Sequence, residues 1–151
     1  MFGLIICYVL CIPYYLYINM SNLGDRQNIV LAAARAAGAE LWERFRRFDR
    51  REVHFKKRHE ILTDADLAAE KMILGQIKDN FPQDQVLAEE SGDNHQESEY
   101  LWVVDPLDGT TNFSMSNPLW SVSIGLFYQN QIQLGAVLAP ALGELFVARA
   151  G

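Results

Sequence analysis

The sequence predicts an α+β fold in which two helices pack on an antiparallel sheet. Two segments in the first half carry apolar residues at helical spacing, whereas the second half holds short apolar runs separated by turn residues. The chain has 151 residues, of which 50% are hydrophobic and 21% charged. This size and composition fit one ordinary globular domain with a substantial core.

The first helix is predicted over residues 25–48, where an apolar stripe repeats at helical spacing: Ile29, Ala33, Ala36, Leu41 and Phe45. A short strand is expected at 52–56. The second helix is predicted to end at Asn80 and to be capped by Thr63 or Asp64. Its buried face is expected to consist of Leu67, Leu74, Ile77 and Phe81.

Strands are predicted from apolar runs and from alternation of apolar and polar residues, at 85–88, 101–104, 120–128, 132–138 and 144–148. Residues 93–99 are polar and are expected to form a loop, in which His95 faces solvent. The chain shows no internal repeat and no interdomain linker.

Residues 1–19 form an apolar, uncharged extension that lacks the basic start of a signal peptide. We interpret Met20 as the true start of the protein. The alternative is that the extension is a membrane anchor, since its length could just span a bilayer. Both cysteines, Cys7 and Cys11, lie in this extension. The remaining chain therefore has no disulfide framework and is compatible with a cytoplasmic location.

The net charge of −6 argues against general nucleic-acid binding. Of the 13 Lys and Arg residues, however, eight fall between residues 44 and 58. This basic segment is either a solvated helix end and hairpin or a surface that attracts an anionic substrate, an RNA or a protein partner.

Residues 105–113 combine two carboxylates with a turn of glycine and threonine. Asp105 and Asp108 offer the oxygen ligands that hard divalent cations prefer. The turn Gly109-Thr110-Thr111 can aim backbone N–H groups at an anion. A plain surface turn is the alternative, because Asp-Gly turns are common.

A second acidic cluster, which begins at Glu89, also follows an apolar run. Two apolar strands that both deliver carboxylates at their C-terminal ends indicate one shared metal site, of the kind used by metal-dependent phosphatases. Asp66 and Glu70 are four residues apart and share one face of the second predicted helix. By composition alone, that face is simply solvated.

Three segments, 62–66, 88–92 and 102–113, resemble motifs of the inositol monophosphatase family, in the same order. The resemblance runs from about residue 22 to residue 151. Thr111-Asn112-Phe113 is similar to inositol monophosphatases, whereas bisphosphate nucleotidases and fructose bisphosphatases differ there. The resemblance implies the N-terminal part of the layered αβαβα sugar-phosphatase fold. The family's second signature, a Trp-Asp pair from the C-terminal α/β half, is absent from this sequence.

The resemblance implies a Mg²⁺-dependent phosphomonoesterase that hydrolyses inositol monophosphate or a similar small sugar phosphate. The implied metal ligands are Glu89, Asp105, the carbonyl of Leu107, Asp108 and, for an outer cation, Asp66. The resemblance also implies that the face shared by Asp66 and Glu70 points at the metal site. Glu89 and Thr110 would orient and deprotonate the attacking water. Phosphate would be bound by Gly109, Thr110, Thr111 and Lys56.

A different class of function stays open because the second signature is missing. The chain could be a truncated, non-catalytic half-domain that binds metal or phosphate, or that serves as a protein or RNA interaction module. Some bacterial relatives bind the transcription machinery, and the basic segment would suit such a role. A homodimer is common in the family, and a membrane partner is expected only if residues 1–19 are an anchor.

Overall fold

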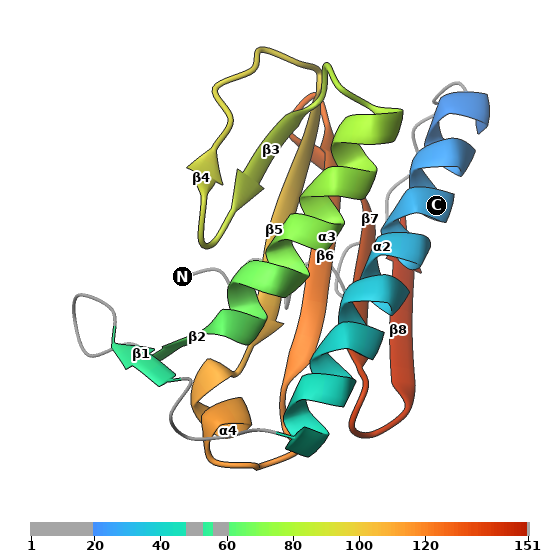
Figure 1. The fold of residues 1–151 in the computed structure, drawn as a ribbon. Helices are drawn as coiled ribbons and strands as arrows, with labels where there is room; N and C mark the ends of the chain where they lie inside the picture. The colour runs from blue at the N-terminus through green and yellow to red at the C-terminus, as the bar shows by residue number, and fades with distance from the viewer. Residues whose placement is uncertain (1–19, 48–52, 56–60, 151) are drawn as a thin grey trace.

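The computed structural model describes residues 20–47, 53–55 and 61–150, which form two long helices, a short helix and two sheets (Figure 1). The elements, in chain order, are α2 (Met20–Arg47), β1 (Val53–Phe55), β2 (Ile61–Thr63), α3 (Asp64–Asn80), β3 (Gln85–Ala88), β4 (Gly92–Asp93), β5 (Tyr100–Asp108), α4 (Thr110–Ser114), β6 (Ser121–Tyr128), β7 (Gln131–Ala139) and β8 (Glu144–Arg149).

The main sheet has six strands in the order β4-β3-β5-β6-β7-β8. All neighbours are antiparallel except β3 and β5, which run parallel. The predicted α+β fold is confirmed, and this parallel pair is the exception to the predicted antiparallel pairing. Strands β1 and β2 pair separately from the main sheet.

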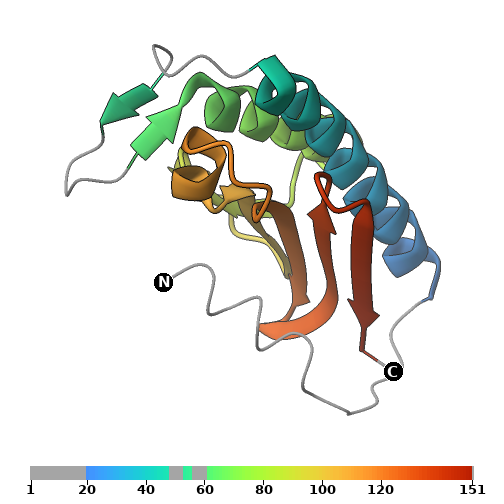
Figure 2. The same ribbon diagram turned by 90° about the horizontal axis from the view of Figure 1, so that it is seen from below.

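Helices α2 and α3 lie side by side and cover one face of the sheet (Figures 1 and 2). The core lies between these two layers. It includes fully buried side chains from α2, α3 and the central strands: Val30, Leu41, Ile73, Ile77, Trp102, Val104, Val122, Ile124, Leu126 and Leu134. Burial of each such side chain contributes roughly 1.5–3 kcal/mol of transfer free energy.

Helix α2 approaches the sheet closely at Gly38. A Cβ atom at this position would lie 2.5 Å from Cδ2 of Leu138 and 3.1 Å from Cγ of Pro140. Any larger side chain would therefore require the Leu138 side chain or the helix to shift. The described part of α2 also buries three alanines on the same side: Ala33, Ala34 and Ala37.

A buried ion pair links the N-terminal part of α2 to the residue that precedes β3. The Arg26 guanidinium donates from Nε and Nη2 to the two carboxylate oxygens of Asp84, each at 2.9 Å. Asp84 Oδ2 also accepts from Nε1 of Trp102 at 2.8 Å. The guanidinium carbon lies 3.6 Å from the ring centre of Tyr100. Since both charges are more than nine-tenths buried, each depends on the other.

Three predictions about the elements require correction. Helix α2 begins at Met20 rather than at residue 25, and β2, β4 and α4 were not predicted. The prediction that Leu67 is buried was wrong, because its side chain is 49% exposed. The buried face of α3 instead consists of Ala65, Asp66, Ala69, Glu70, Ile73 and Ile77. Leu67 precedes Ala69 by two residues, which places it about 200° around the helix.

Two predictions lie outside the described residues, namely the role of residues 1–19 and the placement of Lys56. Across the described residues, no helix combines the length and apolar character that a bilayer crossing requires.

Candidate metal and phosphate site

Glu89 directly follows β3, and Asp105 lies in the last part of the neighbouring parallel strand β5. In the register of β3 and β5, Ala88 lies opposite Val104. The residue after each of these two is one of the acids, Glu89 or Asp105. The main-chain N–H of Glu89 extends the ladder by donating to the carbonyl of Val104 at 3.0 Å. The two acidic clusters of the sequence thus lie at the C-terminal ends of the same pair of strands.

The segment from Asp105 to Asp108 belongs to the end of β5 and does not follow it, as the sequence had suggested. Asp105 pairs with Ser123 and Asp108 pairs with Ser121, with an irregular register between them. Pro106 lies inside this irregular part and has no N–H to donate to the ladder. The strand therefore bulges, and bulges are common beside functional sites because they redirect side chains.

Asp105 lies in an electrostatically unfavourable position. Its side chain is 3% exposed, and its Oδ1 is a buried oxygen without a hydrogen-bond partner. Burial, together with the nearby carboxylates of Glu89 and Asp108, raises the pKa of Asp105 to about 8. A hydrogen bond from the main chain of Leu107 partly offsets this pKa shift. A bound cation would favour the ionised form of such a group.

These acids do not form a closed metal cage, and they suit the open kind of site that Mg²⁺ usually occupies. Among the described residues, no group of three or more His, Cys, Asp or Glu side chains is arranged to hold a metal by itself. Mg²⁺ is usually bound through one or two carboxylates and completes its shell with water and substrate phosphate. The partnerless oxygen of Asp105, beside the carboxylates of Glu89 and Asp108, fits that pattern.

Asp66 and Glu70 are buried in the described structure, with exposures of 1% and 4%. The interpretation of their face of α3 as solvated is therefore wrong. Asp66 lies in the first turn of the helix, at the end beside β2. Glu70 reaches the turn after β3, where its Oε2 accepts a hydrogen bond from the N–H of Glu90 at 2.9 Å. Sequence reasoning missed this contact, because nothing in the spacing indicates it.

The glycine-threonine segment forms a tight turn into α4. Gly109 adopts a φ of 96°, and a Cβ atom there would lie 2.9 Å from the carbonyl oxygen of Leu119. Only glycine suits both conditions. The Thr110 hydroxyl donates to the carbonyl of Leu107 at 3.1 Å. This contact joins the helix start to the bulged end of β5.

Aromatic packing and one asparagine hold α4 in place. The rings of Phe45, Phe113 and Trp120 form a cluster with centroids 5.1–5.3 Å apart. The cluster fixes α4 against the last turns of α2, and each such pair is worth about 0.5–1.5 kcal/mol. Asn112 Nδ2 donates to the carbonyl of Leu119 at 2.7 Å, which closes the loop after the helix. Neither Phe45 nor Asn112 was predicted to support the site.

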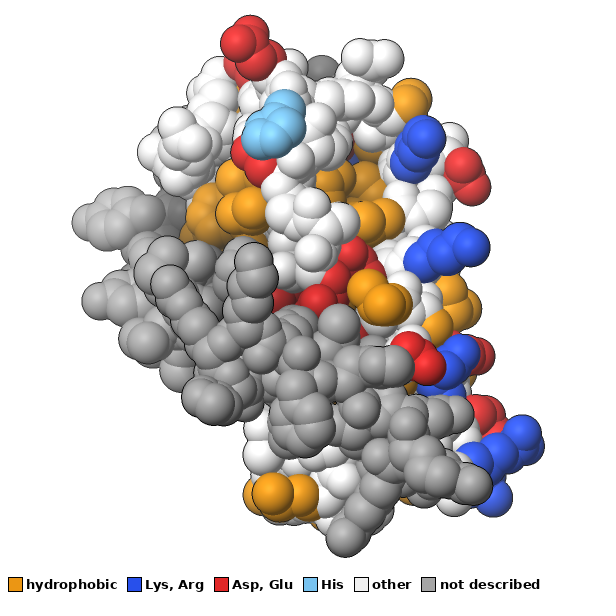
Figure 3. All heavy atoms as spheres, turned by 60° about the vertical axis from the view of Figure 1, so that its left-hand side comes forward, with side chains coloured by type: hydrophobic (Ala, Val, Ile, Leu, Met, Phe, Trp, Pro, Cys, Tyr) orange, Lys and Arg blue, Asp and Glu red, His pale blue; other side chains and the backbone are white. Residues whose placement is uncertain are grey.

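Glu89 and Asp108 both lie within electrostatic reach of Asp105, and Leu107 and residues 109–111 adjoin them in the chain. Glu89 and Asp108 are exposed, so ligands could reach them. On the face drawn in Figure 3, acidic side chains gather near the centre, beside a band of hydrophobic ones. His95 is exposed, as predicted.

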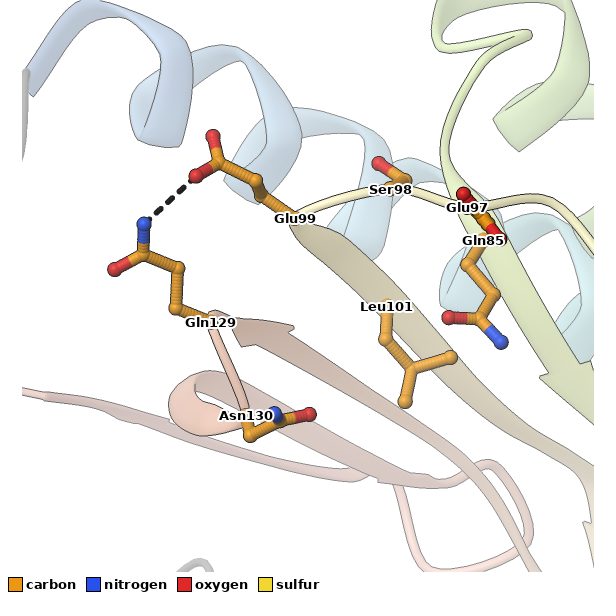
Figure 4. A pocket seen from close by; sticks show the side chains of 7 residues that line it. All are labelled: Gln85, Glu97, Ser98, Glu99, Leu101, Gln129 and Asn130. Carbon is orange, nitrogen blue, oxygen red and sulfur yellow. Dashed lines mark hydrogen bonds between the residues drawn. The ribbon is translucent and has the colours of Figure 1, made fainter.

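A separate hollow lies at the opposite end of β5. Its volume is about 510 Å³, and it is lined by Gln85, Glu97, Ser98, Glu99, Leu101, Gln129 and Asn130 (Figure 4). Gln129 donates from Nε2 to Glu99 at 2.7 Å across its rim. Glu97 and Glu99 are exposed, and none of the lining residues belongs to the acidic site.

The inositol monophosphatase family model matches residues 23–151. Nus factor SuhB of Pseudomonas aeruginosa is 37% identical over 127 residues, which cover 82% of this chain and 47% of that protein. The chain thus spans about half the length of the curated relatives it matches.

Solved structures agree with the sequence matches. The inositol monophosphatase of Anabaena (Nostoc) sp. PCC 7120 superposes with a TM-score of 0.72 and 40% identity, over 87% of this chain and 46% of that one. The suhB protein of Bartonella henselae superposes with a TM-score of 0.79 and 34% identity, over 84% of this chain and 50% of that one. Fold, motif order and sequence matches together show that the chain belongs to the inositol monophosphatase family.

Proposed function

We propose that the protein is a Mg²⁺-dependent phosphomonoesterase that acts on inositol monophosphate or a similar small sugar phosphate. The observation that carries the proposal is the meeting of Glu89, Asp105 and Asp108 at one end of the sheet. Family membership and the likeness to a protein named inositol monophosphatase support the same class of substrate.

In this proposal, the metal is held by oxygen atoms from the ends of β3 and β5. Asp105 would contribute its partnerless Oδ1, and Glu89 and Asp108 would contribute their carboxylates. The carbonyl of Leu107 already accepts from Thr110, but a carbonyl oxygen has a second lone pair for a metal. Asp66 is assigned to an outer cation. When bound, Mg²⁺ supplies charge neutralisation at phosphate and a lower pKa for water.

The chain's own groups would orient the reactants. Glu89 is exposed and can accept a proton from an attacking water. The Thr110 hydroxyl is held by its bond to Leu107, so its lone pairs point in a fixed direction for the same water. The N–H groups of Gly109, Thr110 and Thr111 are assigned to the phosphate oxygens, because the first N–H groups of a helix have no acceptors within it.

Lys56 would add positive charge near the phosphate. This role rests on the family resemblance alone, since Lys56 lies outside the described residues. Because α4 has only five residues, its dipole adds little, and phosphate binding would depend on direct hydrogen bonds.

A role as a non-catalytic interaction module is the second candidate. One observation favours it: curated relatives bear the name Nus factor. In this case, the basic residues near the end of α2 would contact RNA or a protein of the transcription machinery.

The deciding experiment measures phosphate release from inositol 1-phosphate by the 151-residue chain, with and without MgCl₂. We expect Mg²⁺-dependent release that is lost in Asp105→Asn and kept in Asp79→Asn. Asp79 is a suitable control because it is exposed and lies near the far end of α3 from Asp66. Equal release by Asp105→Asn would contradict the proposed site. Absence of release, together with a salt-sensitive RNA complex, would favour the interaction module.

A further inference from the structure

We propose that Glu70 is a positioning residue for the metal site, which holds the turn after β3 so that the Glu89 carboxylate stays beside Asp105. The inference rests on the proposed function, because it assigns Glu89 to the metal. It gives a specific role to Glu70, a residue of α3 that is not among the expected metal ligands.

The contact that carries the inference joins two segments far apart in the chain. Glu70 Oε2 accepts from the main-chain N–H of Glu90 at 2.9 Å, across twenty positions of sequence. Glu70 is 4% exposed and lies in the middle of α3, among the buried side chains that face the sheet. A carboxylate is costly to bury unless it is hydrogen-bonded, so the bond to Glu90 offsets part of the cost of burying Glu70.

Glu89 is held on both sides by main-chain hydrogen bonds. Its own N–H donates to Val104 of β5 at 3.0 Å, and the next N–H, that of Glu90, donates to Glu70. The Glu89 side chain is exposed, so core packing does not fix it. Its direction therefore follows from the main chain between these two anchors.

The bond from Glu70 fixes the main chain of the turn at residues 89–91. Together with the bond from Glu89 to Val104, it preforms the arrangement that a cation would use. Groups behind metal ligands commonly act in this way.

The test separates the hydrogen bond from the charge. Glu70→Gln keeps the length of the side chain and an oxygen that can accept from Glu90, but it removes the charge. Glu70→Asp keeps the charge but shortens the reach by one methylene. A third variant, Ile73→Val, weakens the same buried face of α3 without touching the turn, and it controls for general destabilisation.

Mg²⁺ affinity of the full 151-residue chain is measured by calorimetric titration with MgCl₂, and exchange of the Glu90 amide hydrogen by NMR. We expect Glu70→Gln and Ile73→Val to bind Mg²⁺ within about twofold of the wild type, and Glu70→Asp to bind about tenfold more weakly. Exchange at the Glu90 amide should accelerate only in Glu70→Asp. Rescue by glutamine would identify the hydrogen bond as the cause.

Wild-type affinity in Glu70→Asp, with faster exchange at Glu90, would overturn the positioning role and leave the proposed function intact. Weaker Mg²⁺ binding in Glu70→Gln, with wild-type affinity in Glu70→Asp, would also overturn it, because the charge and not the hydrogen bond would then be responsible. If the wild-type chain itself bound no Mg²⁺, the proposed function would fail first. The wild-type titration therefore distinguishes the two failures.

Discussion

Asp105 combines burial with two carboxylate neighbours, so it opposes folding of the metal-free chain at high pH. Its pKa rises from 3.8 to about 8 on folding. Between these values, the folded chain holds a proton that the unfolded chain has lost. The free energy of unfolding therefore falls as the pH rises through this window. A bound cation would favour the ionised form of Asp105 and so offset this loss of stability.

Asp105→Asn should therefore stabilise the metal-free chain, and do so only at high pH. Asparagine cannot ionise, so we expect the melting temperature in EDTA to rise at about pH 9 and to change little at about pH 4. A gain of 1 kcal/mol would raise it by roughly 2–4 °C. Thermal unfolding followed by circular dichroism checks this. Asp108→Asn removes only one neighbouring charge and should give a smaller gain. Equal effects of Asp105→Asn at both pH values would contradict the assignment.

Gly109 is a second residue whose substitution should destabilise the fold. Gly109→Ala must place a Cβ atom 2.9 Å from the carbonyl of Leu119 while keeping φ at 96°. We expect a loss of about 1–3 kcal/mol in the free energy of unfolding, measured by urea denaturation. Gly75→Ala is the matched control, since nothing lies within 4 Å of its added atom and the residue is in α3. It should stabilise the chain by about 0.5–1 kcal/mol.

At the scale of elements, the sheet strands were predictable from sequence and the short connections were not. Alternation in Val122, Ile124 and Leu126 places all three in the core, as predicted. Strand β3 has the predicted bounds. The two-residue strand β4 and the five-residue helix α4 escape such patterns because a period needs several residues to show itself. Leu67 was misassigned because hydrophobicity alone does not fix the rotation of a helix whose buried face holds alanines and acids.

The candidate site was predictable for a related reason. Two apolar runs that each end in an acid predict that the two acids lie at one end of the sheet. The parallel register of β3 and β5 agrees with this prediction. The bond from Glu70 to Glu90 and the ring cluster around Phe113 depend on how α2 and α3 sit on the sheet. Such contacts between distant segments leave no local signal in the sequence.

The ion pair between α2 and the start of β3 makes a prediction at this scale. Asp84→Ala leaves the Arg26 charge buried without its carboxylate and takes the acceptor from Trp102 Nε1. We expect a loss of about 3–5 kcal/mol in the free energy of unfolding. Urea denaturation measures it. The exposed ion pair between Glu43 and Arg47 provides the contrast, and Glu43→Ala should cost less than about 1 kcal/mol. Similar losses in the two variants would show that burial does not govern the Arg26 pair.

At the scale of the molecule, the described chain is a sheet with its two long helices on one face (Figure 2). Strand β8 ends the sheet, and in the described part of the chain it pairs only with β7. Phe146 and Val147 of this strand are 51% and 43% exposed. A strand with free backbone groups and apolar side chains invites pairing with another chain.

Val147→Lys should therefore reduce self-association of the chain without unfolding it. A lysine on an edge strand opposes strand addition, and a substitution at this exposure should change the free energy of unfolding by less than about 0.5 kcal/mol. Sedimentation velocity over a concentration series measures the association. Leu67→Lys is the matched control, because Leu67 is 49% exposed but lies on α3, away from the edge. If Leu67→Lys lowered association as much as Val147→Lys, net charge and not the β8 edge would control the contact.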